Sequence, residues 1–229
     1  MAGFPIWLDG WPMLGRNGKD VITYPKPEIG GKLHVCTPAT SDEFSKSRLG
    51  LQWQWNHNPD PERWSLTERK GFMRLRASQA TDWLRARNTL TQRIQGPCSE
   101  GSVVMETAGL KDGCIAGFGI FQKPYAYVGI RQTDGKKELI MCNNGEVIGT
   151  PRAFSGERIW IRARVTDKDF TARFYYSLDG ETYFPIGNVL KMGLGFPWTA
   201  NRFALFNFST TAEGVDGYAD FDWFKFTGK

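Results

Sequence analysis

Apolar and polar residues alternate along many short stretches of this chain, and an alternation of period two is typical of β-strands. The clearest example lies within residues 49–66. Its apolar positions are Leu51, Trp53 and Trp55, and its polar positions are Gln52, Gln54 and Asn56. We therefore expect a strand with a large apolar face toward a core and an opposite face of amides that meet water or a ligand.

Further alternating stretches follow up to residue 226, separated by turn signals such as Asp134-Gly135 and Asp179-Gly180. We count about twelve short strands and no stretch with a sustained helical period. This pattern predicts an all-β fold in which two large antiparallel sheets form a sandwich. A closed barrel is less consistent with the pattern, because glycine and polar residues recur on one face.

Two stretches give specific expectations for the core. In residues 72–77 we expect Phe72, together with Met73 or Leu75, to face inward. The final strand, residues 218–226, has two mixed faces, and we expect Phe221 and Trp223 to enter the core.

Residues 1–32 differ from the rest, because prolines and glycines interrupt them and only a short strand at Val21–Tyr24 is expected. We interpret residues 1–32 as the end of another domain followed by a linker. Residues 33–229 would form the sandwich.

The amino-acid composition limits the classes of function and partner that we expect for this chain. Aromatic residues make up 14% of the chain and nine are Trp, which indicates either a deep core or exposed stacking platforms. The net charge is +5, but the basic residues are scattered among acidic ones, so nucleic acid is not an expected partner. No apolar run is long enough to span a membrane, and the start lacks the pattern of a signal peptide. The compartment is therefore not predicted.

The four cysteines have no Cys-x-x-Cys spacing, so we expect free, buried thiols and no zinc site, although disulfide pairing is open in principle. Catalysis is not expected either. Asp220 and Asp222 share a strand face, but in an aromatic-rich strand that has the pattern of a structural element. No other pair of carboxylates is positioned by its spacing to flank a scissile bond.

A resemblance emerges from segments that occur in a fixed order. They read DEFS, LGLQWQWNHNPDPERWSL, GFMRLRA, RNTLTQRIQGP, KDGCIAGFGIFQ, FYYSLDG and GYADFDWFKF. Together they resemble the C-terminal domain of glycoside hydrolase family 43 β-xylosidases and arabinofuranosidases. The opening segment WLDGWPMLGRNGKDVITYPKP resembles the end of that family's propeller catalytic domain and its connector.

The resemblance implies a concanavalin A-like, jelly-roll sandwich. It implies a non-catalytic xylan-binding module of the carbohydrate-binding module family 91 type, with plant cell-wall xylan and the catalytic propeller as partners. The catalytic carboxylates of the family lie in propeller blades that this chain lacks. The alternative is a structural domain that packs on the propeller and completes it without binding glycan.

Amides, carboxylates and arginines bind sugar hydroxyls, and aromatic rings stack on the apolar faces of sugars. For each aromatic residue alone, a place in the core is the simpler interpretation. The candidate ligand-binding residues are Gln52, Gln54, Asn56, Trp64, Trp83, Arg93, Glu106, Gln122, Tyr125, Tyr127 and Trp198.

A structural Ca²⁺ is a further expectation, since sandwiches of this type often hold one where their first and last strands meet. Asp42, Glu43 and Asp222 are the carboxylates near those ends, and backbone carbonyls would complete the six to eight oxygen ligands. The simpler alternative is that Asp42 caps a turn and Asp222 pairs with a basic side chain.

Overall fold

The computed structural model describes residues 5–15, 19, 23, 30–31, 37–193 and 200–228. The chain divides into two compact units, Met1–Thr37 and Pro38–Lys229. The first contains a hairpin of β1 (Pro5–Leu8) and β2 (Trp11–Leu14), joined at Asp9 and Gly10, which both have positive φ. Apart from Thr23, the strand expected at Val21–Tyr24 lies outside the described residues. The origin of residues 1–32 as the end of a propeller stays a prediction.

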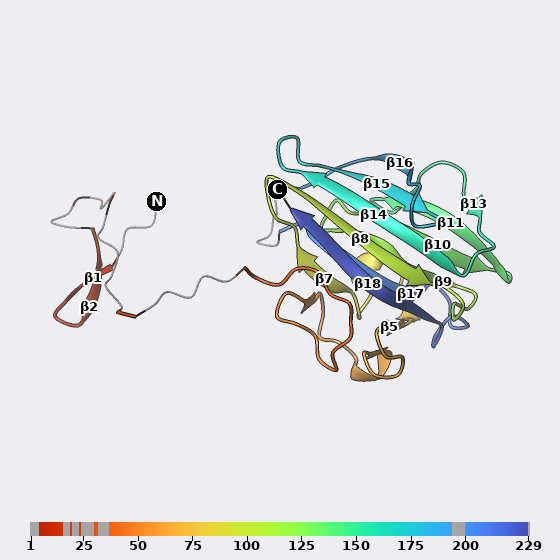
Figure 1. Ribbon diagram of the computed structural model, residues 1–229, viewed down its shortest axis with the longest axis horizontal. Coiled ribbons are helices and arrows are strands. Elements are labelled where there is room, and N and C mark those ends of the chain that lie inside the picture. The colour runs from red at the N-terminus through yellow and green to blue at the C-terminus, as the bar shows by residue number, and fades with distance from the viewer. Residues whose placement is uncertain are drawn as a thin grey trace. The chain divides into compact units, whose positions relative to one another are not determined.

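The second unit is a sandwich of two sheets (Figure 1). One sheet has nine strands, and seven of them follow one another as neighbours. In spatial order they are β12 (Glu146–Val147), β11 (Lys136–Asn143), β10 (Ala126–Thr133), β9 (Cys114–Phe121), β17 (Arg202–Ser209), β7 (Leu90–Arg93) and β3 (Gln54–Trp55). In addition, β13 (Arg152–Ala153) pairs with β11, and β6 (Ser78–Gln79) pairs in parallel with β17.

The other sheet has seven strands, all paired antiparallel. Their order is β16 (Phe184–Lys191), β15 (Thr171–Ser177), β14 (Arg158–Thr166), β8 (Cys98–Glu106), β18 (Tyr218–Gly228), β5 (Met73–Arg76) and β4 (Trp64–Ser65). The described residues form no α-helix, only the short 3₁₀ turns η1 (Pro61–Arg63) and η2 (Trp83–Arg85). No helix among them is long and apolar enough to cross a membrane. The predicted all-β sandwich is confirmed.

The main core lies between the two sheets. Alternate residues of each strand point inward, for example Phe203 and Leu205 from β17 and Ile159 and Ile161 from β14, all fully buried. Dense packing of such side chains provides most of the stabilising burial in a sandwich.

A second apolar cluster covers the outer face of the nine-stranded sheet. At its centre is Trp83 of η2, only 1% exposed. Its ring lies 4.6 Å from Phe206 and 4.9, 5.5 and 5.2 Å from the rings of Phe121, Tyr125 and Tyr127, measured between centroids. This sheet is therefore buried on both faces over β9, β10, β11 and β17.

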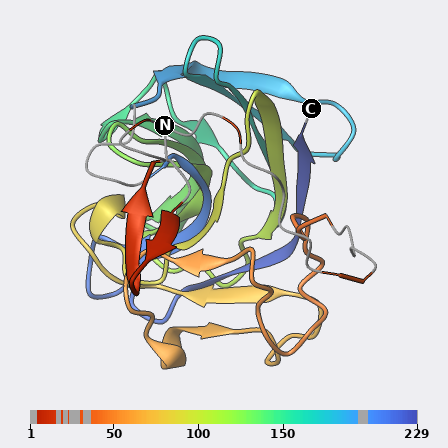
Figure 2. The ribbon, with the colours of Figure 1, turned by 90° about the vertical axis from the view of Figure 1, so that its left-hand side faces the viewer.

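The strands that follow residue 50 gather at one end of the sandwich, as the orange and amber strands at the bottom of Figure 2 show. Here β3 is an edge strand of the nine-stranded sheet and β4 an edge strand of the other. Trp55 of β3 and Trp64 of β4 pack with ring centroids 5.2 Å apart, so the two tryptophans close this edge of the core.

The strand expected around residues 51–56 is shorter than predicted. Only Gln54 and Trp55 form a strand, because the N–H of Trp53 bonds to the carbonyl of Gly50 and turns the chain. Leu51, which we expected in the core, is fully exposed, while Trp53 is buried. In β5, Met73 and Leu75 are fully buried and Phe72 is only partly covered.

In the last strand, the residues that face the core also differ from those expected. Between Phe221 and Phe224 the pairing of β18 with β8 shifts register, since Phe221 lies opposite Met105 and Phe224 opposite Val103. Such a bulge adds one residue and changes which side chains face inward. Phe221 and Phe224 are fully buried, whereas Trp223 is half-buried beside the ammonium of Lys225. The prediction for Trp223 was therefore wrong.

The cysteines partly follow the prediction. Among the described residues, Cys114 and Cys142 are free and buried, as expected, but Cys98 is free and exposed.

The bulge gives a stability prediction. We expect Phe224→Ala to lower the free energy of unfolding by about 3–5 kcal/mol, because it leaves a cavity in the core. Trp223→Ala should cost only about 1 kcal/mol, as at partly exposed positions. Urea denaturation of both variants compares them, and equal losses would contradict the observed register.

Candidate functional site

Polar side chains gather on the outer face of the nine-stranded sheet at its β3–β7 edge. Gln54 lies opposite Thr91, and Arg93 of β7 lies opposite Arg202 of β17. The backbone N–H of Asn56 bonds to the carbonyl of Thr89 at 3.0 Å and continues the pairing beyond β3. Because alternate residues share a face, these side chains lie on the face that also carries the Trp83 cluster. The structure thus brings together three predicted site residues, Gln54, Asn56 and Arg93.

A cavity of about 380 Å³ opens beside this edge, within the usual size range of small-ligand sites. Glutamine amides dominate its polar lining. The lining residues are Pro38, Ala39, Leu51, Gln52, Trp53, Gln54, Thr91, Gln92, Arg93 and Gln95. A second cavity of about 590 Å³ shares Pro38, Ala39, Leu51 and Gln52 with it. We call the first one the amide cavity.

Arg202 lies directly behind the amide cavity. Its Nη1 donates to the hydroxyl of Thr91 at 3.3 Å, and its Nη2 donates to Oδ1 of Asn56 at 3.0 Å. The Thr91 hydroxyl in turn donates to the carbonyl of Gln54 at 2.7 Å. Burial, and to a lesser degree the positive charge of Arg93, lowers the pKa of Arg202 from its ordinary value.

Sequence reasoning missed four residues of this site, namely Thr91, Gln92, Gln95 and Arg202. The alternation of β7 and β17 shows which side chains share a face within each strand. It does not show that β7 and β17 are neighbours, because 108 residues lie between Arg93 and Arg202 in the chain. The glutamines on either side of Arg93, Gln92 and Gln95, were the one signal in the sequence that could have pointed to these residues.

Three predicted aromatic platforms are not available for stacking. Trp83, Tyr125 and Tyr127 are 1%, 6% and 5% exposed because they pack against one another in the outer cluster. Burial raises the pKa of Tyr125 to about 12. Gln122 is also buried, and its side-chain oxygen accepts the N–H of Lys123. These side chains stabilise the sheet and present no ring face to a ligand.

Of the predicted residues, Gln52, Gln54 and Arg93 line the amide cavity and Asn56 contacts Arg202 beside it, whereas the others do not join it. Trp64 packs against Trp55 at the closed edge of the core, and Trp198 lies outside the described residues. Glu106 lies on the outer face of the other sheet, where Arg69 and Arg158 hold its carboxylate.

Arginines pair with the carboxylates on that other sheet. Arg69 contacts both Glu106 and Asp220, and Arg74 donates to Asp220 at 2.7 and 2.8 Å. Burial opposes ionisation of Glu106, but hydrogen bonds from Arg69 and Arg158 outweigh it and lower its pKa. A general acid of a glycosidase needs a raised pKa, so this carboxylate is unsuited to that role.

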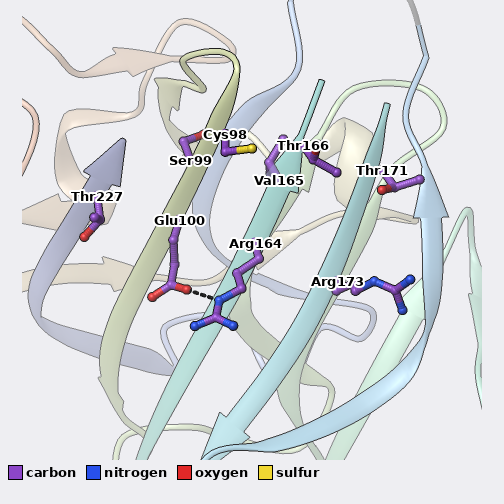
Figure 3. A pocket seen from close by; sticks show the side chains of 9 residues that line it. All are labelled: Cys98, Ser99, Glu100, Arg164, Val165, Thr166, Thr171, Arg173 and Thr227. Carbon is purple, nitrogen blue, oxygen red and sulfur yellow. Dashed lines mark hydrogen bonds and ion pairs between the residues drawn. The ribbon is translucent and has the colours of Figure 1, made fainter. Parts of the chain in front are cut away.

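A larger cleft of about 580 Å³ lies on the seven-stranded sheet (Figure 3). Figure 3 shows the carboxylate of Glu100 directed at Arg164 on the neighbouring strand, and Arg173 directed away from this pair. Arg162 also contacts Glu100, at 3.1 Å. Because its only carboxylate is already paired with arginines and no glutamine lines it, we favour the amide cavity as the ligand site.

The residues expected to bind calcium have other partners. The carboxylate of Asp42 accepts the backbone N–H of Phe44 at 2.9 Å, the indole N–H of Trp53 at 2.8 Å and the amide of Gln52 at 3.3 Å. Within the described part of the chain, no cluster of three acidic, histidine or cysteine side chains could hold a metal. The bonds of Asp42 match the alternative of a turn cap, and calcium with Glu43 and Asp222 stays a prediction.

Comparison with known proteins places this architecture in a family. Residues 41–227 match the model of the β-xylosidase C-terminal concanavalin A-like domain. The chain belongs to this family. It is 33% identical over 96% of its length to a β-xylosidase of Formosa agariphila, and 31% identical over 86% to a β-xylosidase-like protein of Xylanibacter ruminicola.

Solved structures agree with this assignment. A bifunctional GH43-CE protein of Bacteroides eggerthii superimposes with a TM-score of 0.80 and 40% identity, covering 98% of this chain and 30% of its own. A Bacillus licheniformis β-glucanase shares the fold alone, with a TM-score of 0.53 and 14% identity over 84% of this chain and 99% of its own. The chain spans about two fifths of the curated β-xylosidases, at 41% and 37% of their lengths. It therefore corresponds to the accessory C-terminal domain of such enzymes.

The turn held by Asp42 gives a second prediction. We expect Asp42→Ala to lower the free energy of unfolding by about 1–3 kcal/mol, because buried donors lose their acceptor. If Asp42 serves only as this turn cap, a chelator leaves the melting temperature of the unchanged protein constant. A chelator-dependent melting temperature that disappears in Asp42→Ala would instead show that the carboxylate binds Ca²⁺.

Proposed function

We propose that this domain is the accessory part of a β-xylosidase and that it binds xylan-type oligosaccharides in the amide cavity. The proposal depends on one observation, that Gln52, Gln54, Arg93 and Gln95 line a cavity of about 380 Å³. Amides offer both donors and acceptors, which matches the paired donor and acceptor character of sugar hydroxyls. The names of the relatives support xylan as the polymer.

Binding in this cavity would rely on hydrogen bonds more than on stacking. The predicted platforms are buried, and Trp53, the aromatic residue of the lining, is only 8% exposed. Four or five hydrogen bonds with a net value of about 1 kcal/mol each correspond to a dissociation constant of about 1 mM. We therefore expect weak binding, useful where a second domain holds the same substrate.

The catalytic step would belong to a separate propeller domain, as the family resemblance implies. The residues of this chain would then position or retain the glycan near that domain. Arg69, Arg74 and Arg158 neutralise Glu106 and Asp220 here, which supports a non-catalytic role for this pair of carboxylates.

A second candidate function is structural, with the polar edge packing against the catalytic domain. The observation that favours it is Leu51, a fully exposed leucine beside the amide cavity. An isolated apolar side chain of this kind gains free energy when a partner surface covers it. Adding a separately produced catalytic domain and measuring association and xylosidase activity distinguishes this function from glycan binding.

Glycan binding is tested by titrating the chain with xylotetraose in a calorimeter. We expect measurable binding that Gln54→Ala weakens about fivefold or more, since one hydrogen bond to the sugar is lost. Gln79→Ala is the matched control, because Gln79 is exposed on β6 and does not line the amide cavity. Absence of binding, or equal loss in both variants, would contradict the proposed function.

A further inference from the structure

Two arginines lie opposite each other at the edge of the sheet that borders the amide cavity. Arg93 of β7 and Arg202 of β17 are directly opposite partners in the sheet and lie on the same face. Like charges in directly opposite positions destabilise a sheet. Arg93 is exposed and lines the cavity, whereas Arg202 is 9% exposed and lies behind Thr91. Arg93 is thus open to a ligand in the cavity, and Arg202 places a second, buried positive charge directly opposite it.

No carboxylate contacts either arginine within the part of the chain that the structure describes. The partners of Arg202 are neutral, namely the hydroxyl of Thr91, the amide oxygen of Asn56 and the ring of Phe121, 5.4 Å from the guanidinium carbon. Its Nε is buried without a hydrogen-bond partner there. A buried cation without an acidic partner is costly, so this site is poised to accept an anion.

On the other sheet, arginines form ion pairs with carboxylates. Arg74 pairs with Asp220, Arg158 with Glu106 and Arg164 with Glu100. Among the described residues, Arg93 and Arg202 have no such carboxylate partner, and they differ from other unpaired arginines in lying directly opposite each other.

We propose that Arg93, with the buried positive charge of Arg202 directly opposite it, binds the carboxylate of a uronic acid substituent on an oligosaccharide held in the amide cavity. The inference rests on the proposed function, because the glutamines would hold the neutral sugars beside it. Planar guanidinium groups donate to carboxylates in a forked geometry, and such charge-assisted bonds are stronger than neutral ones. A protein carboxylate would satisfy the same charge, but the glutamine lining favours a sugar over an acidic peptide.

The test compares xylotetraose with the same tetraose carrying one glucuronic acid, each titrated into the whole chain. We expect the acidic sugar to bind about tenfold more tightly in 20 mM salt, and this preference to shrink at high salt while neutral binding stays constant. Equal affinity for both sugars would overturn the inference and leave the proposed function intact. Binding of neither sugar would contradict the proposed function itself.

Substitutions of single arginines test which side chain causes the preference for the acidic sugar. We expect Arg93→Gln to reduce the preference to within twofold. Arg173→Gln, which removes the same charge from the exposed surface of β15, should retain it. Retention of the preference in Arg93→Gln, or its loss in Arg173→Gln, would overturn the assignment.

A stability measurement tests the charge repulsion between Arg93 and Arg202 in the absence of sugar. Arg93→Glu places a carboxylate opposite Arg202, so we expect a higher melting temperature than for Arg93→Gln and no preference for the acidic sugar. Equal melting temperatures of the two variants would show that the charges at these positions are not coupled, and would contradict the inference.

Discussion

Burial of both faces of the nine-stranded sheet is the constraint on which the architecture depends. On the inner face, strands β9, β10 and β17 pack against the seven-stranded sheet. On the outer face, Trp83 brings η2 down onto Phe121, Tyr127 and Phe206. The second layer covers the middle of this face, whereas at the β3–β7 edge its polar side chains line a cavity. Packing at the centre thereby determines where a site can form.

The two outer surfaces of the sandwich differ in how their charged side chains are paired. On the seven-stranded sheet, arginines and carboxylates from neighbouring strands neutralise one another, as Arg164 and Glu100 do in Figure 3. At the β3–β7 edge the basic residues meet only neutral oxygens among the described residues, and amides surround them. On the seven-stranded sheet, the paired charges need no external partner. The β3–β7 edge leaves hydrogen-bonding capacity and positive charge for a partner.

Much of the fold was predictable from alternation and turn signals, because a two-sheet sandwich imposes period two on most of its strands. The errors have local causes. One hydrogen bond from Trp53 to Gly50 exposes Leu51, and one extra residue in β18 exchanges Trp223 for Phe224 in the core.

The candidate site was predictable only in part. Gln54, Asn56 and Arg93 follow from the amide face of one strand and a basic position in another. The burial of Trp83 and Tyr127 could not be read from the chain, since it depends on a 3₁₀ turn that covers the sheet from outside. The pairing of Arg93 with Arg202 likewise depends on strand order, which alternation does not encode.

We expect ligands to meet this domain at the β3–β7 edge. Mapping backbone NMR shifts during titration with xylotetraose tests this expectation most directly, because the shifts report location independently of affinity. We expect the largest changes at residues 52–54 and 91–95. Changes centred instead on Glu100, Arg164 and Arg173, or none at saturating sugar, would contradict it.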